Sequence, residues 1–146
     1  MIRLEHIAKR YKMGNVVVTA LDDVSLDVGA GEFLVVLGPS GSGKTTLLNI
    51  IGALDEPSSG TVHINGGNVA LTSTGDRFRF RRETVSFIFQ TFNLFPSLTA
   101  LENVQFVLDM ANASNSAGRA HDVLASVGLG DRVNHFPHEL SGGEQQ

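Results

Sequence analysis

The sequence predicts an α/β fold: a mostly parallel core sheet with helices, an antiparallel β subdomain at the N-terminal end and a helical subdomain at the C-terminal end. Three observations lead to this prediction. An apolar run, a glycine-rich loop and a Pro-free helical run follow one another at 33–51. Short β-branched runs come before that unit, which favours an antiparallel subdomain beside a parallel core. Two segments with helix-start signals follow it.

The segments before the glycine-rich loop are predicted to be short strands. Residues 2–7 alternate between apolar and polar side chains, as a half-buried strand does. Residues 16–19 and 24–28 are further strand candidates, separated by 20–23. A turn at 29–32 then leads into the apolar run 33–37, which we expect to be a buried core strand.

The loop at 38–45 fits the pattern G-x-x-x-x-G-K-[ST], with glycines at 38 and 43 followed by Lys44 and Thr45. Glycine permits backbone dihedrals closed to other residues, so the N–H groups of such a loop can point into one anion-binding concavity. The next helix adds the positive end of its dipole. Lys44 supplies a full charge for the β- and γ-phosphates, and the hydroxyl of Thr45 is a ligand for Mg²⁺. The residues predicted to bind a nucleoside triphosphate are Gly38, Pro39, Ser40, Gly41, Ser42, Gly43, Lys44, Thr45 and Thr46.

After this unit, 61–64 is predicted to be a strand that Asn65-Gly66 closes as a hairpin turn. The arginine-rich segment 76–83 fits either a strand or a short helix. Residues 85–89 are the next expected buried strand, with Gln90 at its carboxyl end. Ligands bind outside the carboxyl ends of strands in open α/β sheets, so the Gln90 amide is placed to reach a phosphate or its metal. The plainer alternative is that Gln90 only caps the strand.

Two helices are predicted in the last third of the chain. Thr99 followed by Glu102 forms a capping box for a helix at 100–111. Ser116 starts a second helix at 117–127, and Gly128 stops it.

Composition restricts the class of protein. The 146 residues suffice for one domain with a core. A net charge of −4 argues against a nucleic-acid surface, and the lack of cysteine excludes a disulfide frame and a thiolate metal site. The sequence has neither an apolar run long enough to span a membrane nor a signal-peptide layout, so we expect a cytoplasmic location.

Three motifs together resemble the ATP-binding cassette family: the phosphate loop, Gln90, and a C-terminal motif similar to that family's signature. The signature residues are Leu140, Ser141, Gly142, Gly143 and Glu144, with Glu144 where most of the family has Gln. Residues 52–55 and 87–104 are similar to the subgroup that includes lipoprotein-releasing and macrolide-export ATPases. From the residues alone, Tyr11 is either a half-buried aromatic at a strand end or a platform for a nucleotide base; the resemblance implies the base-stacking role.

The resemblance implies the ATP-binding subunit of an ABC transporter, with ATP and Mg²⁺ as cofactors and ATP hydrolysis in the complete protein. Lys44 and Gln90 would be the catalytic residues, and Thr45 and Gln90 the metal ligands. Two subunits would pair head to tail, so that residues 141–144 of one reach the ATP of the other. Phe92, Leu94 and Phe95 would contact a membrane permease, which places the protein on the inner face of the cell membrane. The alternative is a cassette without a membrane partner, acting on ribosomes or DNA.

In domain terms, residues 1–146 resemble a partial ATP-binding domain, with the β subdomain and phosphate-loop core at 1–90 and the helical subdomain at 91–146. In the family, the chain continues beyond the signature into a strand with a catalytic Glu and a loop with a switch His, and neither is in this sequence. We therefore expect the C-terminal core strands to be missing. A 146-residue fragment alone should be marginally stable or aggregation-prone, and unable to hydrolyse ATP.

Overall fold

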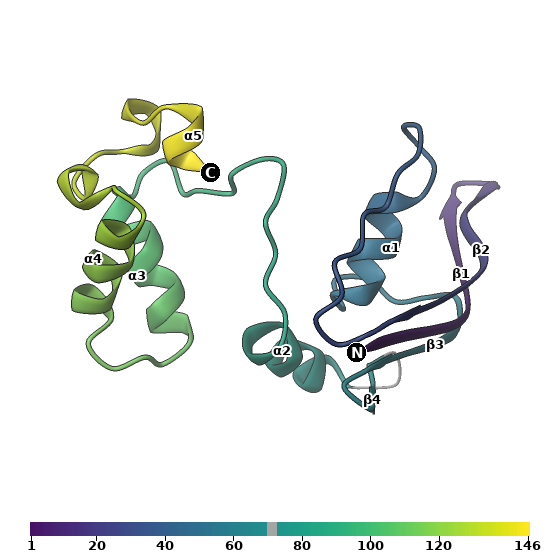
Figure 1. The fold of residues 1–146 in the computed structure, drawn as a ribbon. Coiled ribbons are helices and arrows are strands. Elements are labelled where there is room, and N and C mark those ends of the chain that lie inside the picture. Colours follow the sequence, from purple (N-terminus) through teal and green to yellow (C-terminus); the bar gives the residue numbers. More distant parts are fainter. Residues whose placement is uncertain (70–72) are drawn as a thin grey trace. The chain divides into compact units, whose positions relative to one another are not determined.

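The computed structural model describes residues 1–69 and 73–146, which form two compact units, Met1–Phe87 and Ile88–Gln146. The first unit holds β1 (Ile2–Met13), β2 (Val16–Val28), α1 (Lys44–Ile51), β3 (Ser59–Ile64), β4 (Gly67–Asn68) and α2 (Thr74–Glu83) (Figure 1). The second holds α3 (Ala100–Met110), α4 (Ser116–Ser126), two 3₁₀ turns (Gly130–Arg132 and Pro137–Glu139) and α5 (Gly142–Gln145). Each unit is described by itself below. The division of the chain at residue 90 remains a prediction.

The sheet of the first unit is antiparallel, with strand order β2-β1-β3-β4. This confirms the predicted antiparallel subdomain. The two strand candidates at 16–19 and 24–28 are one continuous strand, β2, because pairing with β1 continues through the residues between them, as in Lys9 opposite Leu21. The predicted hairpin turn is also confirmed: Asn65 and Gly66 join β3 to β4, with φ values of 50° and 84°.

A bulge interrupts β1 near its start. Pairing with β2 shifts register between Leu4 and Ile7, and His6 has a positive φ of 54°. In an uninterrupted strand, side chains three residues apart point to opposite faces. Leu4 and Ile7 nevertheless both enter the core, at 1% and 0% exposure, because the bulge adds a residue between them.

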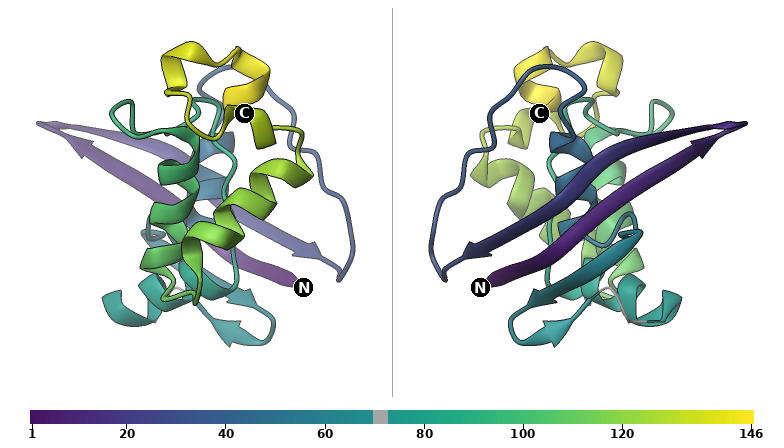
Figure 2. Two further views of the ribbon diagram at one scale, coloured as in Figure 1. Left: turned by 90° about the vertical axis from the view of Figure 1, so that its left-hand side faces the viewer. Right: turned by 90° about the vertical axis from the view of Figure 1, so that its right-hand side faces the viewer.

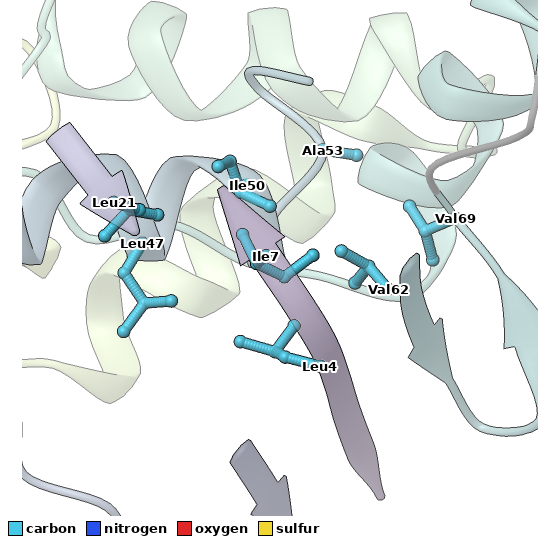
Figure 3. Close-up of a cluster of buried hydrophobic side chains, with 8 residues drawn as sticks. All are labelled: Leu4, Ile7, Leu21, Leu47, Ile50, Ala53, Val62 and Val69. Carbon is cyan, nitrogen blue, oxygen red and sulfur yellow. The ribbon is translucent and has the colours of Figure 1, made fainter. Parts of the chain in front are cut away.

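The core of the first unit lies between this sheet and α1, which covers one face of it (Figure 2). From α1 only Leu47 and Ile50 are buried, one helical turn apart, whereas Leu48 is half exposed. The buried cluster, drawn in Figure 3, consists of Leu4, Ile7, Leu21, Leu47, Ile50, Ala53, Val62 and Val69. α1 is therefore an amphipathic helix that anchors to the sheet along one stripe.

Two predicted core strands are not strands in the structure. Residues 33–37 and 85–89 carry no strand assignment, and side chains predicted to be buried are exposed: Phe33 90%, Leu37 86% and Ile88 85%. Apolar composition favours burial of these side chains, but a strand also needs a neighbouring strand to pair with its backbone N–H and C=O groups. The sheet formed by the described residues includes neither segment. The arginine-rich segment, left open between strand and helix, is the helix α2, whose N-cap Ser73 accepts a hydrogen bond from the N–H of Asp76.

The second unit is helical, as predicted. α3 and α4 pack around Ala100, Leu124 and Leu140. The predicted capping box is confirmed: the Thr99 hydroxyl accepts from the N–H of Glu102, and the Glu102 carboxylate accepts from the N–H of Thr99. No helix in the described part of the chain is long and apolar enough to cross a membrane.

Candidate functional site

The glycine-rich segment lies where the sequence predicts it, as a loop that leads directly into α1 (Figure 1). Gly43 is the N-cap of α1 and has a φ of 88°, in the left-handed region. A Cβ at this position would lie 2.5 Å from the carbonyl oxygen of Ala20 and 3.0 Å from the side chain of Leu21. Gly43 therefore permits both the turn and a close approach of the loop to β2.

The N-terminal end of α1 suits an anion. The first amide groups of a helix have no acceptor within it and carry the positive end of the dipole. α1 has no acidic residue in its first turn and no side-chain cap that would occupy these donors. At Gly38 a Cβ would lie 2.7 Å from the hydroxyl oxygen of Ser42, so the loop is also closed tightly on itself. A closed loop ahead of a helix start without acidic residues is an arrangement in which backbone amides can bind an anion.

Lys44 places its ammonium group against the same loop. Its Nζ donates to the carbonyl oxygens of Gly38, at 2.9 Å, and Pro39, at 2.7 Å, and lies 3.4 Å from the hydroxyl of Ser42. These three partners are neutral, so the positive charge of Lys44 is not compensated by them. Thr45, the next residue, is exposed and carries a hydroxyl oxygen of the kind that Mg²⁺ takes as a ligand. The donor set of the loop thus fits a phosphate chain with its metal.

Tyr11 lies on β1 in the same unit and is half-buried. Its hydroxyl donates to Oδ2 of Asp55 at 2.7 Å, and Nζ of Lys9 lies 4.9 Å from its ring centroid. Tyr11 and the loop are connected through the sheet: Tyr11 pairs with Val18 of β2, two residues before Ala20, against which Gly43 lies.

The other predicted site residues belong to the second unit. Gln90 is exposed and lies in an irregular segment, so its predicted place at the end of a strand is wrong. Phe92 and Phe95 are 40% and 48% exposed, and Leu94 is partly buried. The ring of Phe95 packs edge to face on Phe106, with centroids 5.0 Å apart.

The signature residues form a helix start. Ser141 is the exposed N-cap of α5, its Oγ accepts from the N–H of Glu144 at 3.3 Å, and its own N–H donates to the Glu144 carboxylate at 2.7 Å. Arg132 lies 3.5 Å from the same carboxylate. The hydroxyl and backbone N–H of Ser141, together with Arg132, hold the pKa of Glu144 below its ordinary value. Glu144 therefore completes a capping box and leaves the helix start intact.

Sequence reasoning missed Lys9, Asp55 and Asn103. Lys9 and Asp55 meet across 46 residues of chain, and no local pattern indicates such a pair. Asn103 is the one buried polar residue among those the structure describes, at 7% exposure. A polar amide among the apolar positions of an amphipathic helix was the signal available for it.

Comparison with known proteins identifies the family. A family model described as ABC transporter matches residues 21–146. The ABC transporter ATP-binding protein MJ1508 of Methanocaldococcus jannaschii is 46% identical over 148 residues, which cover this whole chain and 66% of that protein. The macrolide export ATP-binding/permease protein MacB 1/2 of Paracoccus denitrificans is also 46% identical over 148 residues, all of this chain and 22% of that protein.

Among solved structures, the ATP-binding cassette MJ0796, in a dimeric post-hydrolysis state bound to ADP and Pi, matches with a TM-score of 0.88 and 41% identity. The match covers 99% of this chain and 65% of that one. The chain thus spans about two thirds of the length of MJ1508 and of MJ0796. The predicted fold, a phosphate-loop core with antiparallel and helical parts, is confirmed by this similarity, although two of its expected core strands are absent from the described sheet. This chain belongs to the ABC transporter family and has the fold of its ATP-binding cassette.

Proposed function

We propose that this chain is the ATP-binding part of an ABC transporter, in which ATP bound and hydrolysed between two cassettes drives a membrane permease. One observation carries the proposal: a glycine loop closes ahead of α1, whose first turn has no acidic residue, and the Lys44 ammonium lies against that loop. The relatives support it, since one is named as an ATP-binding protein, one as an ATP-binding/permease protein, and one was solved with ADP and Pi.

In this proposal the loop residues 38–46 and the amides of α1 bind the triphosphate. Lys44 stabilises negative charge on the β- and γ-phosphates, both on binding and as hydrolysis proceeds. Thr45 and Gln90 hold Mg²⁺, which when bound neutralises phosphate charge. Gln90 also orients the attacking water through its amide. Tyr11 stacks on the base.

The second unit supplies the contacts with other proteins. Ser141, Gly142, Gly143 and Glu144 face the nucleotide of a second cassette, so that ATP joins the two subunits and hydrolysis separates them. The capping box at Ser141 supports this role because it fixes the conformation of the segment before a partner arrives. Phe92, Leu94 and Phe95 contact a cytoplasmic segment of the permease, as the exposure of the two phenylalanines allows. The protein would then lie peripherally on the inner face of the membrane.

Nucleotide binding tests the site directly. Titration calorimetry with MgATP should show that Lys44→Ala weakens binding at least about tenfold, because it removes a charged donor from the phosphate site. Lys12→Ala, which removes an exposed lysine from the same unit, is the matched control and should bind as the unmodified protein does. Equal affinities for all three proteins would refute the proposed phosphate site.

Capture of a permease tests the transport role. The protein should co-purify with a polytopic membrane protein, and Phe95→Asp should abolish this because a charge replaces an apolar contact. Val107→Asp, on an exposed position of α3, is the control and should leave capture unchanged. Co-sedimentation with ribosomes, unaffected by Phe95→Asp, would instead support the cassette without a membrane partner.

A further inference from the structure

Asp55 receives two hydrogen bonds from side chains of β1 that the phosphate site does not require. It lies in the segment that leaves the C-terminal end of α1 and reaches β1. Its Oδ2 accepts from the hydroxyl of Tyr11 at 2.7 Å, and its Oδ1 accepts from Nζ of Lys9 at 2.6 Å. The Asp55 side chain is 29% exposed and that of Lys9 only 12%, so the ion pair is shielded from water on one side. A partly buried pair of this kind is screened less than a pair of exposed charges.

Lys9 holds the same ring from another direction. Besides Asp55, its Nζ donates to the backbone carbonyl of Glu56 at 2.6 Å, and it lies 4.9 Å from the centroid of Tyr11. An ammonium at this distance attracts the π-face of the ring. The Tyr11 ring is therefore fixed at its hydroxyl by Asp55 and near its face by Lys9.

The backbone beside Tyr11 is fixed by the same segment. The N–H of Arg10 donates to the hydroxyl of Ser58 at 2.9 Å, and the N–H of Ser58 donates to the carbonyl of Ala8 at 2.8 Å. Residues 55–58 thus hold both the side chain of Tyr11 and the strand that carries it. This segment follows α1, and α1 begins directly after the phosphate loop, so one helix joins the loop to the residues that hold the ring.

The electrostatics of Asp55 agree with this geometry. Burial alone would raise the pKa of Asp55, but the hydrogen bonds from Lys9 and Tyr11 and the charge of Lys9 outweigh it, and the pKa lies below its ordinary value. Asp55 is consequently ionised at neutral pH and can accept from both partners at once.

We propose that Asp55, assisted by Lys9, is a positioning residue for the nucleotide base: it holds the Tyr11 ring in the orientation that stacks on the base, and so raises the affinity for a triphosphate that carries a base. This inference rests on the proposed function, in particular on base stacking by Tyr11. Without these anchors, binding must first immobilise the ring, which weakens the affinity for ATP about 3- to 10-fold. The competing interpretation is that Lys9 and Asp55 only fasten β1 to the segment after α1.

The two interpretations differ in what happens to a ligand without a base. Inorganic tripolyphosphate offers the loop the same phosphate chain as ATP and nothing for Tyr11. We would measure the Kd of MgATP and of magnesium tripolyphosphate by calorimetry on the purified protein and on Asp55→Ala, Tyr11→Phe and the double variant. Asp55→Ala and Tyr11→Phe should each weaken ATP binding about 3- to 10-fold and leave tripolyphosphate binding unchanged. The double variant should be no weaker than either single one, because both remove the same hydrogen bond.

Controls separate this inference from the proposed function. Asp27→Ala removes an ion pair of the same sheet, Arg3 to Asp27 at 2.7 Å, and should change neither Kd. Lys44→Ala should weaken the binding of both ligands; if it weakens the binding of neither, the phosphate site itself is refuted. Tyr11→Ala should weaken the binding of ATP alone; if it does not, base stacking is refuted, and the positioning role of Asp55 with it.

The inference is overturned if Asp55→Ala weakens the binding of ATP and of tripolyphosphate to the same extent, or weakens the binding of neither. In both cases the results for Lys44→Ala and Tyr11→Ala would still support the nucleotide site. If Asp55→Ala fails to fold, Tyr11→Phe decides, since it removes one hydroxyl oxygen and keeps the ring and the ion pair. Asp55→Asn then serves as the conservative variant: its amide oxygen still accepts from Tyr11, so it should retain more of the ATP affinity than Tyr11→Phe does.

Discussion

Replacing Asn103 by alanine should loosen the segment that carries the proposed permease contact. The Asn103 side chain is buried in α3, where its Oδ1 accepts from the N–H of Phe95 at 2.8 Å. Its Nδ2 lies within hydrogen-bond distance of three carbonyl oxygens, those of Phe95, Leu98 and Thr99, at 3.0–3.2 Å. One amide therefore holds the backbone of Phe95 at both its donor and its acceptor, and ties it to the start of α3.

The expected cost follows from these contacts. Alanine leaves the N–H of Phe95 and the carbonyl groups that faced Nδ2 without this partner, in a region only partly open to water. An unsatisfied buried group costs about 1–3 kcal/mol, and a single lost hydrogen bond about 1 kcal/mol net. We expect a local destabilisation of about 2–3 kcal/mol. If local opening limits exchange, the Phe95 amide should then exchange its hydrogen about 30- to 150-fold faster.

Hydrogen exchange followed by NMR or mass spectrometry is the assay. Asp109→Ala, at an exposed position of the same helix, is the control and should alter exchange at Phe95 by less than about threefold. The variant should also capture less permease than the unmodified protein, because Phe95 is no longer held. Exchange at Phe95 that stays within threefold in Asn103→Ala would refute the reasoning, since it would mean that water replaces the amide without cost.

Two further predictions concern stability. Gly60→Ala should lower the melting temperature by several degrees, because Gly60 has a φ of 91° and an added Cβ would overlap the carbonyl oxygen of His6 in β1. Gly14 has a positive φ too, of 61°, but open space around it, so Gly14→Ala is the control and should lower the melting temperature clearly less. Equal losses in both variants would contradict this. The backbone N–H and hydroxyl of Thr99 lower the pKa of Glu102, so its contribution to stability is present above its ordinary pKa and is lost as the pH falls through the lowered value. In urea unfolding at a series of pH values, Glu102→Gln should therefore differ most from the unmodified protein at neutral pH and least below about pH 4; a constant difference would be evidence against the capping role.

Features determined by neighbouring residues could be predicted from the sequence. The hairpin at Asn65-Gly66 and the capping box of Thr99 and Glu102 each depend on residues at most three positions apart, and both are confirmed. The loop ahead of α1 is likewise confirmed, because its glycines specify the backbone locally. Its ligand remains a prediction.

Features that depend on distant partners could not be predicted. The apolar runs 33–37 and 85–89 were expected to be strands, but their composition does not say which strand they pair with, and the described sheet does not include them. Pairing with β1 likewise decided that β2 is one strand and not two. In the candidate site, the partner of Tyr11 is 44 residues away, so the sequence indicated the aromatic but not the carboxylate that holds it.

The extra residue in β1 has a consequence for how the chain can vary. Beyond the bulge at His6 the strand is one residue out of the alternation that Leu4 begins, and its pairing with β2 shifts again between Ile7 and Lys9 and between Lys9 and Arg10. Deleting or inserting a single residue near His6 would turn the side chains of Lys9 and Tyr11 away from Asp55, although β1 could still form backbone hydrogen bonds with its neighbouring strands. Changes of length in this strand should therefore be tolerated only in pairs, even though half of its residues are exposed to solvent.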